Sequence, residues 1–212
     1  METRRFGLID RVIGEIDKGI KTLYAPARPS RDPPAVPEGE TLNAAQRGRS
    51  ARLMRVNHSG EVAAQALYQG QALTAGDPAV AAAMRRAAAE ENDHLAWCEL
   101  RLRELHGRTS LLNPLWYAGS FAIGALAGTL GSGTNLGFVA ETERQVETHL
   151  RGHVERLGDA DPRSRAILEQ MSHDEMAHGA QATSMGGKEL PLAVRMAMRL
   201  TARALTEGSY WL

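Results

Sequence analysis

The stretch Glu-Asn-Asp-His at residues 91–94 recurs in kind as Glu-Met-Ala-His at residues 175–178. In each stretch a glutamate and a histidine stand three residues apart, so on an α-helix both side chains leave the same face, one turn apart. Apolar residues continue that face at helical spacing, which predicts that both pairs point into a core. The residues that share these faces are Met84, Ala87, Cys98, Leu102 and Leu105 in the first segment, and Leu168, Met171, Ala182 and Met185 in the second.

Each pair is preceded, one predicted helix earlier, by a further glutamate on an apolar face: Glu61 before the first pair and Glu143 before the second. An ionised carboxylate in an apolar core is costly unless it is paired, protonated or bound to a metal. The repeated order of glutamate and Glu-x-x-His indicates a duplicated two-helix unit, and it is the pattern of ferritin-like bundles that hold two iron or two manganese ions. Four carboxylates and two imidazoles suit two divalent first-row metal ions. The predicted metal ligands are Glu61, Glu91, His94, Glu143, Glu175 and His178.

Composition narrows the class of protein. The chain has 212 residues, enough for one domain with a substantial core, and its 25 basic residues balance 25 acidic ones. A net charge of zero argues against a nucleic-acid partner. A single cysteine, Cys98, excludes a closed zinc site built on several cysteines and suits a reducing compartment. Residues 1–24 carry acids and no unbroken apolar run, so we expect no secretory signal and a location on the cytoplasmic side.

We expect an all-α fold, a ferritin-like four-helix bundle with extra N-terminal, crossover and C-terminal helices. Residues 1–24 are predicted to form an amphipathic helix that either packs on the bundle or contacts a membrane surface. Residues 25–43 contain many prolines and indicate an extended linker. Residues 44–212 form the predicted metal-binding domain, with bundle helices expected from residue 44 or 49 to 75, up to residue 106, over 135–157, and up to the glycines at 186–187.

Two further segments of that domain stand out. Residues 109–140 contain no charged residue, and 115–130 is the most apolar run, although it is short and rich in glycine for a transmembrane helix. It is either a buried crossover helix or, as we prefer, a helix that faces lipid or lines the entrance for an apolar substrate. The C-terminal segment 190–212 carries a row of arginines, which is either a solvated face or a contact for anionic lipid head groups. These arginines are Arg195, Arg199 and Arg203.

Four stretches of the chain resemble one known family, the di-iron demethoxyubiquinone hydroxylases of ubiquinone biosynthesis. They are RLMRVNHSGE at 52–61, EENDH at 90–94, AETE at 140–143 followed by His149, and HDEMAH at 173–178. The likeness runs from residue 50 to the end of the chain, and RVNHSGE is its most specific part. It implies that the six predicted ligands hold iron, that His149 lies near the iron, and that Arg52 lies near the path of quinone and reductant.

The resemblance also implies an activity: hydroxylation of the ring of a polyprenylated demethoxyubiquinol with O2. Expected cofactors are two iron ions per chain, with electrons from NADH or from the quinol itself. The expected setting is peripheral attachment to the cytoplasmic face of the bacterial inner membrane, as a homo-oligomer or within a quinone-biosynthesis complex. Three alternatives stay open: a ferroxidase or iron-storage protein, a manganese catalase, and a non-catalytic lipid carrier or scaffold of such a complex.

Overall fold

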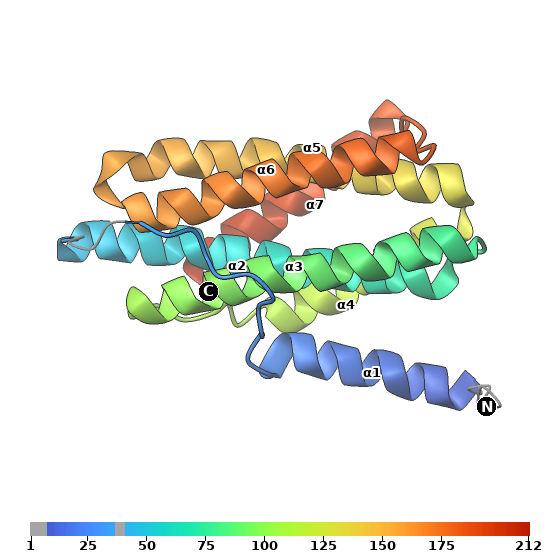
Figure 1. Cartoon of the computed structure of the whole chain (residues 1–212), viewed down its shortest axis with the longest axis horizontal. Coiled ribbons are helices and arrows are strands. Elements are labelled where there is room, and N and C mark those ends of the chain that lie inside the picture. The colour runs from blue at the N-terminus through green and yellow to red at the C-terminus, as the bar shows by residue number, and fades with distance from the viewer. Residues whose placement is uncertain (1–7, 37–40) are drawn as a thin grey trace.

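The chain folds into long helices that lie side by side, as the computed structural model shows in Figure 1. The structure describes residues 8–36 and 41–212, and these contain no β-strand, which confirms the all-α class. The four bundle helices are α2 (Ala44–Thr74), α3 (Pro78–Glu104), α5 (Ser132–Leu157) and α6 (Pro162–Ser184). Residues 1–7 and 37–40, which belong to the predicted N-terminal helix and linker, lie outside the described residues.

Side chains at the helix starts fix where three bundle helices begin. Asn43 caps α2 in a reciprocal box, accepting from the Gln46 amide at 2.9 Å while the Gln46 side chain accepts from the Asn43 amide. Asp77 accepts from the Ala79 amide, and Pro78 occupies the first helical position of α3. Asp161 caps α6 in the same way, as its position before a proline predicted.

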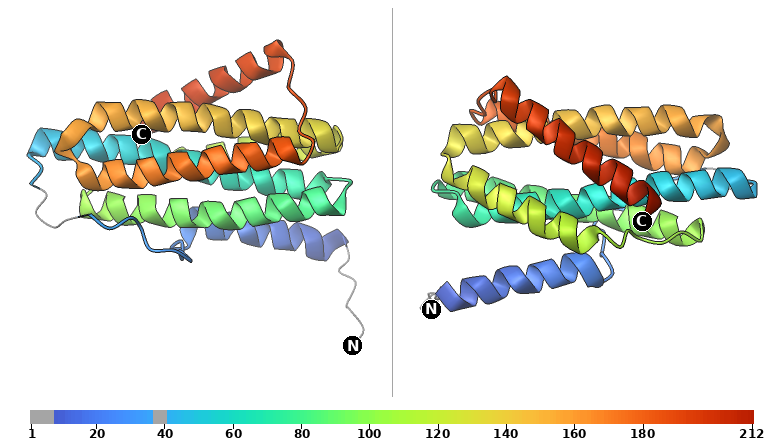
Figure 2. Two further views of the ribbon diagram at one scale, coloured as in Figure 1. Left: turned by 45° about the horizontal axis from the view of Figure 1, so that its top comes forward. Right: turned by 180° about the vertical axis from the view of Figure 1, so that it is seen from behind.

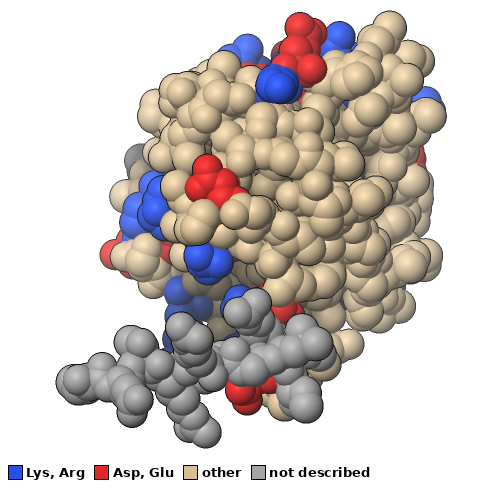
Figure 3. Space-filling view, turned by 90° about the vertical axis from the view of Figure 1, so that its right-hand side faces the viewer, with Lys and Arg blue, Asp and Glu red and all other residues tan. Residues whose placement is uncertain are grey.

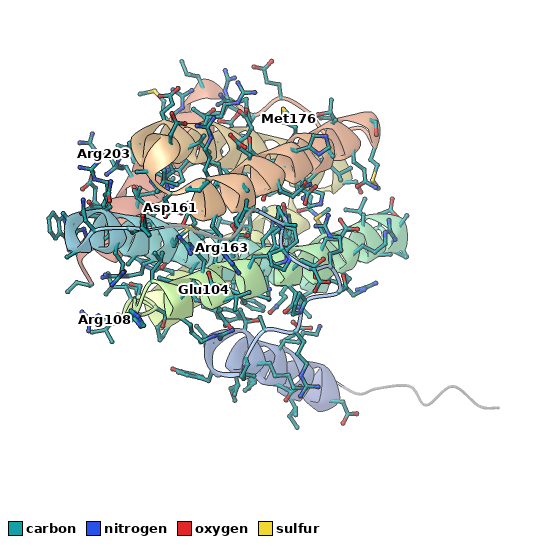
Figure 4. The ribbon with its side chains drawn as sticks, turned by 60° about the vertical axis from the view of Figure 1, so that its left-hand side comes forward. Glu104, Arg108, Asp161, Arg163, Met176 and Arg203 are labelled. Carbon is teal, nitrogen blue, oxygen red and sulfur yellow. The ribbon has the colours of Figure 1, made fainter. Side chains whose placement is uncertain are left out.

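The bundle is built from two hairpins, α2 with α3 and α5 with α6. A buried ion pair at one end joins them, because Arg101 of α3 donates to the α6 cap Asp161 at 2.8 Å. At the surface beside it, Glu104 accepts from Arg163 at 2.6 Å (Figure 4). Two apolar clusters fill the interior, one around Leu53, Trp97, Leu150 and Leu168 and the other around Tyr68, Met84, Leu136 and Val139. Along each bundle helix, the predicted metal ligands come between residues of one apolar cluster and residues of the other.

The charge-free segment forms α4 (Asn113–Thr129), which packs on α2 backbone against backbone. A Cβ atom added at Gly124 would stand 2.1 Å from the carbonyl oxygen of Leu67, and one added at Gly70 would stand 2.3 Å from that of Phe121. Thr74 of α2 donates to the carbonyl of Ala125 at 2.7 Å. The glycines that weaken this helix in isolation are therefore what let it approach α2.

Of the two alternatives for this segment, the fully buried crossover helix is wrong, because the outer side of α4 is exposed to solvent. Leu115, Leu126 and Leu130 each expose about 60% of their surface. Among the described residues, no helix combines the length and the apolarity needed to cross a bilayer.

The two outer helices also present apolar side chains outward. In α1 (Leu8–Tyr24), Gly19 and Thr22 face the bundle, whereas Ile13, Ile16 and Ile20 are more than half exposed. Helix α1 therefore contacts α2 and α4 through Gly19 and Thr22, whereas these three isoleucines of its apolar stripe point away from the bundle. In α7 (Leu192–Trp211), which crosses the bundle obliquely in Figure 2, the row of Leu192, Met196 and Leu200 is exposed as well.

Two smaller expectations need correction. Helix α3 ends at Glu104, two residues early, and the residue in left-handed conformation beyond it is His106 (φ 55°) rather than a glycine. Met185, expected on the buried face of the second Glu-x-x-His helix, is 38% exposed because α6 has already ended at Ser184.

Candidate metal centre and the adjoining cavity

The structure brings all six predicted ligands together from four helices. Two groups of side chains have ligand atoms within 4.8 Å of one another. The first group is Glu61, Glu91, His94 and Glu175, and the second is Glu91, Glu143, Glu175 and His178. Five of the six are buried and His178 is nearly so.

Glu91 and Glu175 belong to both groups, so the geometry suits two ions with these two carboxylates between them. His94 Nδ1 lies 2.9 Å from Glu91 and 3.4 Å from Glu175. His178 Nδ1 lies 3.2 Å from Glu91 and 3.5 Å from Glu175. Each histidine thus turns the same ring nitrogen towards the shared acids, and the two halves of the centre repeat each other in their ligands.

The electrostatics of the cluster favour a cation. Burial, and then the charge of a neighbouring carboxylate, raise the pKa values of Glu61 and Glu143 well above their usual range. Burial would lower the pKa of His178, but the neighbouring carboxylates of Glu175 and Glu91 raise it to about 11. Among the described residues, the buried oxygens Glu143 Oε1 and Glu175 Oε2 have no hydrogen-bond partner. Metal ions would replace the protons that such a crowded set of acids otherwise retains and would give these oxygens a partner.

The outer nitrogens of the two histidines meet acids that the sequence did not single out. His94 Nε2 lies 3.0 Å from Asp174 Oδ2, and His178 Nε2 lies 2.9 Å from Glu90. A histidine ligand usually donates its second ring N–H to a carboxylate, which fixes the ring and its tautomer. The sequence does offer a way to find these two acids, because Asp174 and Glu90 each directly precede a predicted glutamate ligand.

Of three nearby glutamates, Glu143 is the one that the structure places in the cluster. Glu141 is paired with Arg144 at 2.7 Å, and Glu147 is paired with Arg151. Neither is a member of either candidate group within the described residues.

A largely apolar cavity of about 580 Å³ leads to the cluster from the side of α2, α4, α5 and α7. Glu61 and His149 are among its polar lining residues. Its walls include Gly60, Leu67, Ile123, Phe138, Val146 and Leu205. Two of these wall residues, Gly60 and Ile123, belong to the α2 and α4 helices that the glycine contacts hold together.

The structure separates the two residues predicted to act on the substrate. His149 lines the cavity, and burial, with a smaller effect of Arg156, lowers its pKa to about 4, so its ring is neutral. Its Nε2 is buried and has no hydrogen-bond partner in the part of the chain that the structure describes, and its ring centroid lies 3.9 Å from that of His153. Arg52 does not line this cavity; it lies over the ring of Tyr210, 5.3 Å from the centroid.

A bundle of two hairpins that each supply a glutamate and a Glu-x-x-His pair to one buried cluster defines the ferritin-like class of carboxylate proteins. Within that class, the model of the family described as ubiquinone biosynthesis protein COQ7 matches residues 48–209, and the chain belongs to this family. The chain is also similar over almost its whole length to curated proteins named 3-demethoxyubiquinol 3-hydroxylase.

One such relative, from Azoarcus sp. (strain BH72), is 54% identical over 205 residues, which cover 96% of this chain and 99% of the relative. Another, from Cupriavidus necator, is 56% identical over 205 residues, which cover 95% of this chain and 99% of the relative. The resemblance inferred from the short motifs is thereby confirmed.

Proposed function

We propose that this protein is a 3-demethoxyubiquinol 3-hydroxylase of ubiquinone biosynthesis, an oxidoreductase that adds one hydroxyl group to the ring of its quinol substrate. The observation that carries the proposal is the buried cluster of four glutamates and two histidines at the inner end of an apolar cavity. Full-length relatives with this activity in their names support it.

The six side chains fit two iron ions, with Glu61 and His94 on one side, Glu143 and His178 on the other, and Glu91 and Glu175 between them. When bound, the iron would activate O2, so that one oxygen atom enters a ring C–H bond and the other leaves as water, with two electrons from NADH or from the quinol itself. The protein keeps the acids apart from bulk water, because Glu61, Glu91, Glu143 and Glu175 are almost fully buried.

The cavity suits a quinol ring with a polyprenyl tail. Its walls are apolar over most of their area, so an apolar substrate would be bound chiefly by the hydrophobic effect. The ring would lie at the inner end, beside Glu61. His149 supports this placement, because its neutral imidazole has a ring nitrogen, Nε2, that could form a hydrogen bond with a hydroxyl group of the substrate ring.

The test is anaerobic reconstitution with Fe(II), followed by metal analysis and by incubation with demethoxyquinone, a reductant and O2. We expect two iron ions per chain and a product heavier by one oxygen atom. Glu175→Ala should lose both iron and turnover, whereas Glu169→Ala, which removes an exposed acid of the same helix, should lose neither. Iron uptake with fast Fe(II) oxidation or peroxide loss, but no quinone turnover, would instead indicate a ferroxidase or a catalase. Substrate binding without turnover would indicate a carrier or scaffold.

We further propose that the protein attaches peripherally to a membrane surface, the cytoplasmic face of the bacterial inner membrane, through α1, α4 and α7. Support comes from the exposed apolar side chains of all three helices and from the exposed Arg199 and Arg203 on α7. Figure 3 shows an end of the bundle on which charged side chains are sparse over a broad area. Such a surface would let an insoluble quinol pass from lipid to the cavity.

Flotation with lipid vesicles tests this attachment. The double variant Ile16→Glu/Ile20→Glu should float poorly with vesicles that contain anionic lipid, because it places charge on the outer face of α1. Met176→Glu changes an apolar residue on α6 that is about half exposed, and it should float like the unaltered protein (Figure 4). Equal flotation of all three proteins would argue against a membrane contact through α1.

A further inference from the structure

The proline-rich segment before α2 is attached to the metal-site helix α3 by a series of hydrogen bonds. The Asn92 side chain donates to the carbonyl of Arg28 at 2.5 Å. The Ser30 amide and hydroxyl donate to the two oxygens of Asp93 at 2.5 and 2.9 Å. We call residues 27–31 the strap. Asn92 and Asp93 lie between Glu91 and His94, so the strap is fastened directly outside two predicted ligands.

Arg31 is the residue of the strap that reaches across to a second helix. Its Nε donates to Asp93 of α3 at 2.9 Å, and its Nη2 donates to Asp174 of α6 at 2.8 Å. The Arg31 carbonyl accepts from the indole of Trp97 at 2.9 Å, and the guanidinium lies 5.1 Å from the centre of the same ring. The side chain is therefore held at several points although it is 48% exposed.

Asp174 connects this arginine to the metal centre. Its Oδ2 accepts from Arg31 and also faces His94 Nε2 at 3.0 Å, while its Oδ1 accepts from Gln170 at 2.9 Å. With Asp174 as the acceptor of the Nε2 proton, His94 presents its unprotonated Nδ1 to Glu91 and Glu175, where an ion would bind. The orientation of His94 thus depends on where Asp174 is held.

The other half of the centre has no such support. The acid that faces His178 Nε2 is Glu90, whose side chain is 54% exposed. Among the described residues, no arginine or lysine is paired with Glu90. The two halves repeat each other in their ligands, but within residues 8–36 and 41–212 only the His94 half is braced from outside the four-helix bundle.

We propose that Arg31 is a positioning residue of the metal centre, which holds Asp174 against His94 and so sets the affinity of the ion position that His94 serves. This role rests on the metal site proposed above. It assigns a function to a segment that precedes the residues matched by the family model, which begin at residue 48.

The test uses Co(II), whose visible absorption reports on its ligands, added to the metal-free full-length protein under argon. Partner residues outside the ligand set typically change metal affinity by about 10- to 100-fold, and for the half-exposed Arg31 we expect Arg31→Ala to weaken one of two Co(II) sites by about tenfold. The absorption bands of that site should shift as well. Arg31→Lys should restore only part of the affinity, because an ammonium group cannot span Asp93 and Asp174 as the guanidinium fork does.

Arg165→Ala is the matched control, since Arg165 also joins two carboxylates, Asp159 and Glu169, at 2.9 and 2.8 Å but contacts no predicted ligand. It should bind Co(II) like the unaltered protein. On an Asp174→Asn background, Arg31→Ala should cause little further loss, because the route through Asp174 is already broken.

The results of this test distinguish a failure of the role proposed for Arg31 from a failure of the metal site itself. An unaltered protein that takes up two Co(II) ions, together with Arg31→Ala that matches it in affinity and spectrum, would overturn the role of Arg31 alone. A full effect of Arg31→Ala on the Asp174→Asn background would also overturn it. An unaltered protein that takes up no Co(II) would refute the metal site itself and the role of Arg31 with it.

Discussion

Replacing Gly124 by alanine tests whether α4 touches α2 as closely as the structure shows. The new Cβ would stand 2.1 Å from the Leu67 carbonyl oxygen and 3.0 Å from its Cα, where ordinary contact begins at 3.4 Å. The obstructing atoms belong to the backbone of a bundle helix, so they cannot rotate away, and α4 must move outward. Forced overpacking costs about 1–3 kcal/mol, while alanine in place of glycine stabilises a helix by about 1 kcal/mol. Because the clash is severe, we expect a net loss of about 2 kcal/mol in the free energy of unfolding.

Gly119 provides the matched control within the same helix. A Cβ there meets nothing within 4 Å, so Gly119→Ala should raise the free energy of unfolding by about 0.5–1 kcal/mol. The assay is urea unfolding of the metal-free protein, followed by circular dichroism in the far ultraviolet. The two variants should move the midpoint in opposite directions. If Gly124→Ala is as stable as Gly119→Ala, the close approach of α4 to α2 is refuted.

Two further predictions concern the cavity and the buried His153. Gly60 lines the cavity, and a Cβ added there would meet no described atom within 4 Å. Gly60→Phe should therefore fold, fill the cavity and lower kcat/KM by about tenfold or more, mainly by raising KM. The control Gly60→Ala should change kcat/KM little. Normal kinetics in Gly60→Phe would show that the substrate enters elsewhere; Co(II) uptake should be unchanged. Burial lowers the pKa of His153 to about 2, so the folded state keeps this ring neutral while the unfolded state binds a proton below pH 6.5. As the pH falls from 6.5 to 4.5, the protein should therefore lose about 2–3 kcal/mol relative to His153→Gln, measured by urea unfolding; a pH-independent difference would contradict the buried neutral ring.

The bundle and the position of its six clustered residues could be predicted from the sequence because local periodicity encodes them. Glu91 and His94 are one helical turn apart on an apolar face, and this fixes their direction before any tertiary contact is known. Asp77 and Asp161, each followed by a proline, likewise marked the starts of α3 and α6.

The faces of the outer helices could not be predicted in this way. A helix such as α4 has no polar stripe, so its composition does not say which side is covered; the register of Gly124 against Leu67 decides it, and that register is a property of the pair of helices. In α1 the periodicity was detected, but the buried side is the one with Gly19 and Thr22, because Tyr117 and Gln65 of neighbouring helices meet it there.

The contacts of the strap could not be predicted from the sequence for a different reason. Arg31 and Asp174 are 143 residues apart, and an arginine within a proline-rich stretch carries no local pattern that would identify its partner. Only the packing of α3 beside α6 brings the two carboxylates close enough for one guanidinium to reach both.

The sharing of Glu91 and Glu175 has a consequence for how the protein assembles. Each helical hairpin carries three of the six side chains, yet each ion position draws on both hairpins, because the position nearest His94 needs Glu175 and the one nearest His178 needs Glu91. Neither hairpin alone can complete a coordination set, and without cations the crowded acids retain protons, as the raised pKa values of Glu61 and Glu143 indicate. Metal ions would therefore bind tightly only when the two hairpins have packed together. Metal binding would in turn stabilise that packed arrangement, so metal uptake and correct folding are coupled.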